Sequence, residues 1–180
     1  MKKVIVSLSV LFFMISFTET AHAQWGIGAS YEIRKEEPTN GFGVRVERSM
    51  LGFVPVVDFN MRAHFSYFNE TNTLSPSGAA ISGDTEAFDY GLALTAGIKI
   101  ALIKPYVGFG IGAETIDFET AGQGSFKENN FYWNAFGGAE LRLLPLLNPF
   151  LEYRITNLTS TDQLDTSNIG RVAIGINLRF

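Results

Sequence analysis

The chain has 180 residues, no cysteine and a formal net charge of −4 at pH 7. This length suits one domain, and the mild acidity argues against nucleic-acid binding, which depends on clustered cationic side chains. Without cysteine, neither a disulfide framework nor a lipid-modified cysteine behind a signal sequence is possible.

Residues 1–23 have the layout of a secretory signal peptide. Lys2 and Lys3 precede the apolar run Val4–Phe17, and Ala21-His22-Ala23 forms a small–x–small cleavage site. The alternative, a retained membrane helix, needs about 20 apolar residues, which this run does not reach. We therefore expect Sec-dependent export, cleavage after Ala23 and a mature domain covering Gln24–Phe180.

The mature segment opens with alternating residues. In Gln24–Arg34, apolar residues such as Trp25 and Ile27 fall on one face of an extended strand, and polar residues or glycines fall on the other. A helical reading of the segment around Tyr90 would scatter its apolar side chains around the axis, so the period of two favours strands. The same period predicts eight strands, at Gln24–Arg34, Gly41–Arg48, Val54–Phe68, Glu86–Ala101, Lys104–Phe118, Asn129–Leu143, Pro149–Asn157 and Gly170–Phe180.

The connections between these strands alternate in length. Those at 49–53, 102–103 and 144–148 are short, whereas those at 35–40, 69–85, 119–128 and 158–169 are mostly long and polar. An even strand count with short turns on one side and long loops on the other is typical of bacterial outer-membrane barrels. A soluble lipocalin-like barrel shares the alternation but buries its apolar face. We predict an all-β, eight-stranded, antiparallel up-and-down transmembrane β-barrel, apolar outside and polar inside.

Four segments carry a resemblance to a known family. KPYVGFGIGAE (Lys104–Glu114), NAFGGAELRL (Asn134–Leu143), FLEYRITN (Phe150–Asn157) and the C-terminal VAIGINLRF resemble strands of the small outer-membrane β-barrel family that includes OmpX, Ail and the barrel of OmpA. The resemblance implies a location in the Gram-negative outer membrane and contact with its lipid and lipopolysaccharide. It also implies insertion by the barrel-assembly machinery, for which Phe180 serves as the assembly signal. It transfers no functional residue.

The inward face is rich in charges of both signs. The interior of an eight-stranded barrel is only wide enough for side chains, and an unpaired buried charge is costly. We therefore expect a closed, salt-bridged lumen. A narrow ion path is the alternative, because the inward glycines leave room for water. The expected network comprises Glu32, Arg45, Glu47, Asp58, Arg62, Lys99, Glu114, Glu140, Arg142, Glu152, Arg154, Arg171 and Arg179, with Arg34 and Asp89 on the same face.

One pair of residues points to possible catalysis. His64 and Ser66 share a strand face, and outer-membrane lipid A deacylases use a His and a Ser on one strand. Here Tyr67-Phe68 follows Ser66, which departs from the small polar continuation of those enzymes. The register turns His64 into the lumen, where a bond to Asp58 or Glu114 is the expected structural role.

These observations favour a non-enzymatic, monomeric barrel with a structural or surface-interaction role and no cofactor. An extracellular partner is expected at loops 69–85 and 158–169, and the excess of acidic over basic loop residues disfavours polyanionic partners. Clustered carboxylates are the side chains that bind calcium, but no loop here shows the residue spacing of a known calcium-binding loop. The alternatives are a small-ligand or ion transport barrel resembling OmpW and, less favoured, a lipid A-modifying hydrolase.

Overall fold

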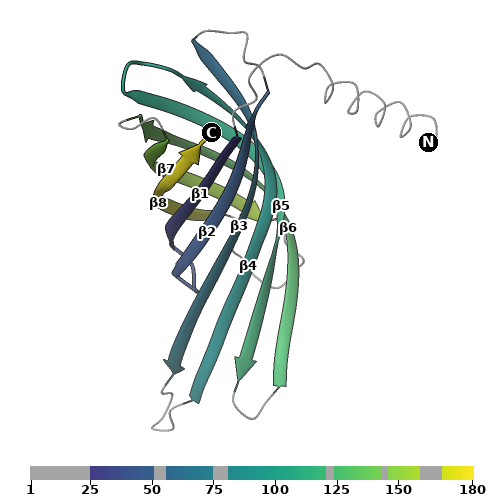
Figure 1. Cartoon of the computed structure of the whole chain (residues 1–180). Helices are drawn as coiled ribbons and strands as arrows, with labels where there is room; N and C mark the ends of the chain where they lie inside the picture. The colour runs from purple at the N-terminus through teal and green to yellow at the C-terminus, as the bar shows by residue number, and fades with distance from the viewer. Residues whose placement is uncertain (1–24, 51–55, 75–80, 121–123, 143–145, 159–167) are drawn as a thin grey trace, which may run out of the picture.

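The strands follow one another around a closed sheet (Figure 1). The computed structural model describes residues 25–50, 56–74, 81–120, 124–142, 146–158 and 168–180. The predicted signal peptide lies outside this range. The strands are β1 (Trp25–Arg34), β2 (Asn40–Ser49), β3 (Val57–Leu74), β4 (Ile81–Ile98), β5 (Ile103–Thr120), β6 (Gly124–Leu141), β7 (Leu147–Leu158) and β8 (Ile169–Arg179).

Every strand pairs antiparallel with its neighbours in the sequence, and β1 pairs with both β2 and β8. This confirms the predicted closed, eight-stranded up-and-down barrel. Around the closed part of the sheet, the backbone donors and acceptors of each strand have partners on both sides, as a sheet in hydrocarbon requires. No described residue belongs to a helix long and apolar enough to cross a membrane.

The two faces of the sheet separate as the alternation predicts. On the outer face Ile27 is 48% and Val44 55% exposed, whereas Glu47 and Arg62 on the inner face are 2% and 1% exposed. The lipocalin-like alternative is therefore wrong, because that fold buries its apolar face. An aromatic row crosses four strands on the outer face, in the register Tyr31↔Phe42↔Tyr67↔Phe88. Such a row suits the membrane–water interface.

The strands differ in length in a way that the sequence does not indicate. Each of β3, β4, β5 and β6 has 18 residues, against 10 to 12 in the other four. Most of the expected loop at 69–85 is a ladder running from Asn69↔Glu86 to Leu74↔Ile81, and most of the expected loop at 119–128 is also strand. The apolar alternation fades there because neither face touches hydrocarbon, but the hairpins continue.

The longer strands form a four-stranded extension, here called the projecting sheet, made of residues 69–74, 81–86, 115–120 and 124–131. Figure 1 shows it running past the other strands, away from the end where the chain terminates. The pairing of β2 with β3 reaches Gly41↔Phe68, and that of β6 with β7 reaches Tyr132↔Leu158. Within the described residues, the two outer edges of the projecting sheet therefore have no neighbouring strand.

Candidate functional site: the charged lumen

The centre of the lumen is organised around Arg62 on β3. Its Nε lies 2.8 Å from Glu47 Oε1 on β2, and its Nη1 lies 2.5 Å from Glu152 Oε2 on β7. Glu152 also pairs with Arg45 at 3.4 Å and with Arg154 at 2.9 Å, and it accepts a hydrogen bond from Tyr106 Oη at 3.0 Å. One carboxylate thus joins three arginines and a phenol. The contacts of Glu152 with Arg62, Arg45 and Tyr106 cross the barrel and connect strands that are not neighbours.

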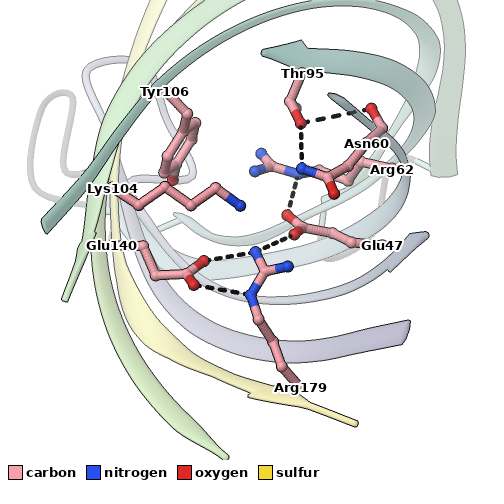
Figure 2. A pocket seen from close by; sticks show the side chains of 8 residues that line it. All are labelled: Glu47, Asn60, Arg62, Thr95, Lys104, Tyr106, Glu140 and Arg179. Atoms are coloured by element: carbon pink, nitrogen blue, oxygen red, sulfur yellow. Dashed lines mark hydrogen bonds and ion pairs between the residues drawn. The ribbon is translucent and has the colours of Figure 1, made fainter. Parts of the chain in front are cut away.

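A second group lies toward the chain termini (Figure 2). Arg179 Nη2 lies 3.0 Å from Glu47 and 2.8 Å from Glu140, and Lys104 Nζ lies 2.5 Å from Asp58. About 170 Å³ of space, none of it wide enough for a water-sized sphere, is lined by Glu47, Asn60, Arg62, Thr95, Lys104, Tyr106, Glu140 and Arg179. The described side chains therefore fill this part of the lumen.

A third group lies toward the projecting sheet. Arg171 pairs with Glu32 at 3.1 Å and with Asp89 at 2.5 Å, and Arg34 pairs with Glu114. The guanidinium carbons of Arg34 and Arg171 lie 4.5 and 4.8 Å from the centre of the Phe68 ring, within the range of cation–π attraction. Phe68 packs with Ala87 and Ile116 in a buried apolar cluster. This cluster covers the charged groups on the side of the projecting sheet.

The lumen is balanced in charge. Among the residues that the structure describes, each lumen cation pairs with at least one carboxylate, and the carboxylates equal the cations in number: Arg34, Arg45, Arg62, Lys104, Arg154, Arg171 and Arg179 against Glu32, Glu47, Asp58, Asp89, Glu114, Glu140 and Glu152. Pairing of this kind offsets the desolvation of the ions, because an unpaired buried charge costs several kcal/mol.

The structure corrects two predicted members of this network. Lys99 and Arg142 are exposed, because β4 ends at Ile98 and β6 ends at Leu141. Alternate residues point to opposite faces only within a strand. The alternation therefore does not place residues that lie beyond its end. The missed member is Lys104, which is 3% exposed. The sequence indicates its inward orientation, because Lys104 lies two residues before the inward Tyr106 and so shares its face of the strand.

His64 lies in the lumen, as expected, but with different partners. Its Nε2 lies 3.0 Å from Tyr132 Oη and 3.5 Å from Asp89, and not against Asp58 or Glu114. Tyr132 in turn donates a hydrogen bond to Asp89. A Cβ atom at Gly91 would lie 2.9 Å from both His64 Cε1 and Tyr132 Oη. Small residues on the intervening strands therefore let His64 and Tyr132 meet, a long-range effect that strand alternation does not reveal.

The remaining candidates have simpler surroundings. Ser66 is 1% exposed, and its hydroxyl accepts a hydrogen bond from Arg171 at 3.4 Å. Phe180 follows β8, is 64% exposed, and exchanges backbone hydrogen bonds of 2.9 Å with Trp25. Among the described residues, no group of three or more His, Asp or Glu side chains is placed to hold a metal ion. Two acidic residues of the predicted loop 158–169, Asp162 and Asp165, lie outside the described residues.

Comparison with solved structures finds the same fold in several outer-membrane proteins. Neisserial surface protein A matches with 14% identity over 87% of this chain and 96% of that chain, at a TM-score of 0.60. Ail of Yersinia pestis, in complex with the heparin analogue sucrose octasulfate, matches with 17% identity over 88% and 97%, at 0.57. The N-terminal barrel of Pseudomonas aeruginosa OprF matches with 10% identity over 89% and 100%, at 0.53.

Identities this low show the fold alone. A comparison with curated protein sequences gives no match. The family model for the outer membrane protein beta-barrel domain matches residues 4–180, nearly the whole chain. With its apolar outer face, charged lumen and closed eight-stranded sheet, the chain therefore belongs to the outer membrane protein beta-barrel domain family, and it is a protein of the outer membrane.

Proposed function

We propose that this protein is a non-conducting, non-enzymatic outer-membrane barrel that presents its projecting sheet to extracellular partners. The observation that carries the proposal is the combination of a lumen filled by paired charges with a four-stranded extension whose outer edges have no neighbouring strand in the described part of the chain. The filled lumen argues against a transport path, and the open edges offer a binding surface.

The paired side chains of the lumen support a closed barrel. Arg62, Glu47 and Glu152 bridge β2, β3 and β7 across the interior, so ion passage would require several buried pairs to separate together. In planar bilayers we expect the purified protein to give no steady conductance. A robust, ion-selective current would contradict the proposal and favour the OmpW-like transport alternative.

The two residues on which the hydrolase alternative depends, His64 and Ser66, are not open to lipid. His64 and Ser66 are buried on the inner face, and both are held by the ion pairs around Asp89 and Arg171. A deacylase must bring its nucleophile to an acyl ester in the membrane, whereas these side chains lie behind the sheet. We expect the lipid A of cells overproducing the protein to keep its full set of acyl chains, as measured by mass spectrometry.

The edge of β6 has no contact with another strand beyond Tyr132 among the described residues. Residues 124–131 extend beyond its pairing with β7, and an open edge offers unpaired backbone groups to an added strand. The edge of β3 is partly covered at its base, because the backbone nitrogen of Thr39 donates to Glu70 at 2.7 Å. We therefore place the partner, an extended peptide segment, on β6.

The charge of the projecting sheet selects the class of partner. Its described side chains include Glu70, Asp84, Glu86, Asp117 and Glu128 against Lys127. This surface favours a basic segment and disfavours polyanions. It thus contrasts with Ail, whose structure contains a heparin analogue.

The binding surface can be tested with the protein in lipid nanodiscs and labelled alternating peptides, one Lys/Val and one Glu/Val, by fluorescence anisotropy. We expect the basic peptide to bind and the acidic one to bind at least tenfold more weakly. A variant with the β5–β6 hairpin shortened by residues 118–126 should lose binding while keeping heat-modifiable migration. Equal binding of both peptides, or binding unaffected by shortening, would count against the proposal.

A further inference from the structure

The outer face of the barrel carries a hollow between β4 and β5. Its walls are Leu92 and Leu94 on one side and Phe109 and Ile111 on the other, with Met61 beside them. The space is about 300 Å³ and is lined almost entirely by apolar atoms. We call it the β4–β5 slot.

The register of the two strands explains the slot. Leu92 lies opposite Ile111 and Leu94 opposite Phe109, while the paired residues Ala93 and Gly110 between them turn their side-chain positions inward. The floor of the slot is therefore bare backbone.

One wall of the slot is supported by an aromatic contact. The Phe109 ring stacks on Trp133 of β6, with ring centres 5.9 Å apart and planes inclined by 22°. The Phe109 wall of the slot is therefore packed against β6.

We propose that the β4–β5 slot binds one acyl chain of a phospholipid more tightly than the rest of the barrel surface does. The inference rests on the outer-membrane location of the protein, not on the proposed surface interaction. The slot is continuous with the lipid-facing belt, where Leu92 is 58% and Ile111 63% exposed, so hydrocarbon is the solvent that meets it. A small, almost entirely apolar hollow suits a single chain, whereas a stable protein partner needs a much larger surface.

The position of the slot favours phospholipid over lipopolysaccharide as the source of the chain. Leu92 and Leu94 lie two and four residues from Tyr90, on the side away from the projecting sheet. With the projecting sheet outside the cell, the slot opens toward the inner leaflet, which contains phospholipid.

The first test is native mass spectrometry of the protein extracted from outer membranes in a mild detergent. We expect wild-type protein to retain one phospholipid. The Leu94→Phe variant, whose larger side chain fills the slot, should retain at least fivefold less. The control is Leu151→Phe on β7, at a lipid-facing position of similar exposure, 54% against 62% for Leu94, and it should behave as wild type.

Three results would overturn the inference: no lipid retained by wild type, equal retention by Leu94→Phe, or a bound mass that matches lipid A. Heat-modifiable migration shows whether each variant folds, and Leu92→Phe replaces Leu94→Phe if that variant fails to assemble.

The second test uses Trp133, one of only two tryptophans in the chain. In a Trp25→Phe background, Trp133 reports on the neighbouring slot. Phosphatidylcholine brominated in mid-chain, at a low fraction of the bilayer, should quench Trp133 at least twofold more than a tryptophan placed at Leu151 in a chain lacking the natural two. Equal quenching at the two positions would contradict preferential binding.

Discussion

Arg62 shows how a single residue stabilises the interior. It is 1% exposed, contacts Glu47 and Glu152, and lies 4.7 Å from the centre of the Phe136 ring. Removing it leaves two buried carboxylates short of their strongest common partner. The exposed Lys99 has no comparable surroundings in the described structure, although the sequence pattern placed both residues in the same network.

We expect Arg62→Ala to lower the free energy of unfolding by about 3–5 kcal/mol, the range for removing one member of a buried ion pair. Lys99→Ala should change it by less than about 0.5 kcal/mol, as surface substitutions usually do. Urea titration of the protein in lipid vesicles, followed by tryptophan fluorescence, measures both. Equal effects of the two substitutions would contradict the buried network.

A milder loss is expected for Arg154→Ala. Glu152 keeps Arg62, Arg45 and Tyr106 as partners when Arg154 is removed, and Glu140 is unaffected because it pairs with Arg179. The same titration should therefore give a loss smaller than that of Arg62→Ala, with the bilayer conductance still absent. A loss as large as that of Arg62→Ala would contradict the view that Arg62 and Arg45 still stabilise the Glu152 carboxylate when Arg154 is removed.

At the scale of the element, β5 illustrates how neighbouring strands share the lumen. Its inward glycines Gly108 and Gly112 lie opposite the large inward residues Phe136 and Tyr132 of β6. The aromatic side chains occupy the space that a side chain on β5 would need. Large residues on one strand therefore require small ones on the next.

This arrangement predicts opposite outcomes for two glycine substitutions. In Gly112→Ala, the new methyl group would overlap the Tyr132 hydroxyl and the carbonyl oxygen of Tyr90, whereas in Gly137→Ala the nearest atom lies 3.8 Å away. We expect the first to destabilise the barrel by about 1–3 kcal/mol, as overpacking does, and the second to be neutral or slightly stabilising. Urea midpoints compare the two, and similar midpoints would contradict the packing argument.

The turn between β4 and β5 offers a second test at this scale. Ala101 has a positive φ of 48°, a left-handed conformation that costs a residue with a Cβ about 1–2 kcal/mol. Part of the benefit of glycine is lost to its greater freedom in the unfolded chain. Ala101→Gly should therefore raise the unfolding free energy by up to about 1 kcal/mol, while Ala135→Gly within β6 should lower it by about 0.5–1 kcal/mol. A loss of stability in Ala101→Gly would argue against strain in the turn.

For the whole molecule, the even number of strands returns both ends of the barrel to one rim. Backbone hydrogen bonds of 2.9 Å join Trp25 and Phe180 at that rim. We expect this rim to face the periplasm. Proteinase K added to intact cells should cut within 75–80 or 159–167 and spare the 99–102 turn. Cleavage at 99–102 would reverse the orientation, and with it the assignment of the slot to the inner leaflet.

Assembly of the barrel gives a separate prediction. Deleting Phe180 should lower the amount of folded, heat-modifiable protein in the membrane, because the terminal aromatic residue is expected to be read by the assembly machinery. The thermodynamic part is small, since even a lipid-facing charge near the interface costs only about 0–1 kcal/mol. Phe42→Ala, at an outward aromatic 69% exposed at the other end, is the control and should assemble normally. Normal levels of the deletion variant would contradict an assembly signal.

The sequence by itself determined the strands, their faces and the closure of the barrel. Residues such as Ile27 and Glu47 reveal their side of the sheet because hydrocarbon and a crowded polar lumen select opposite side chains at every second position. This selection is local, so one chain suffices to predict it. It also predicted that charges gather inside, including Arg62 and Glu152.

Only the tertiary structure decided which charges meet and where the strands end. The contacts of Arg62 with Glu152, and of His64 with Tyr132, cross the barrel, and they depend on the relative shift of strands far apart in the sequence. The inclusion of Lys104 and the exclusion of Lys99 depend on where β4 ends and β5 begins. The projecting sheet was missed for a related reason. Beyond the membrane neither face of a strand meets hydrocarbon, so hairpin pairing continues without the apolar alternation that signals a strand.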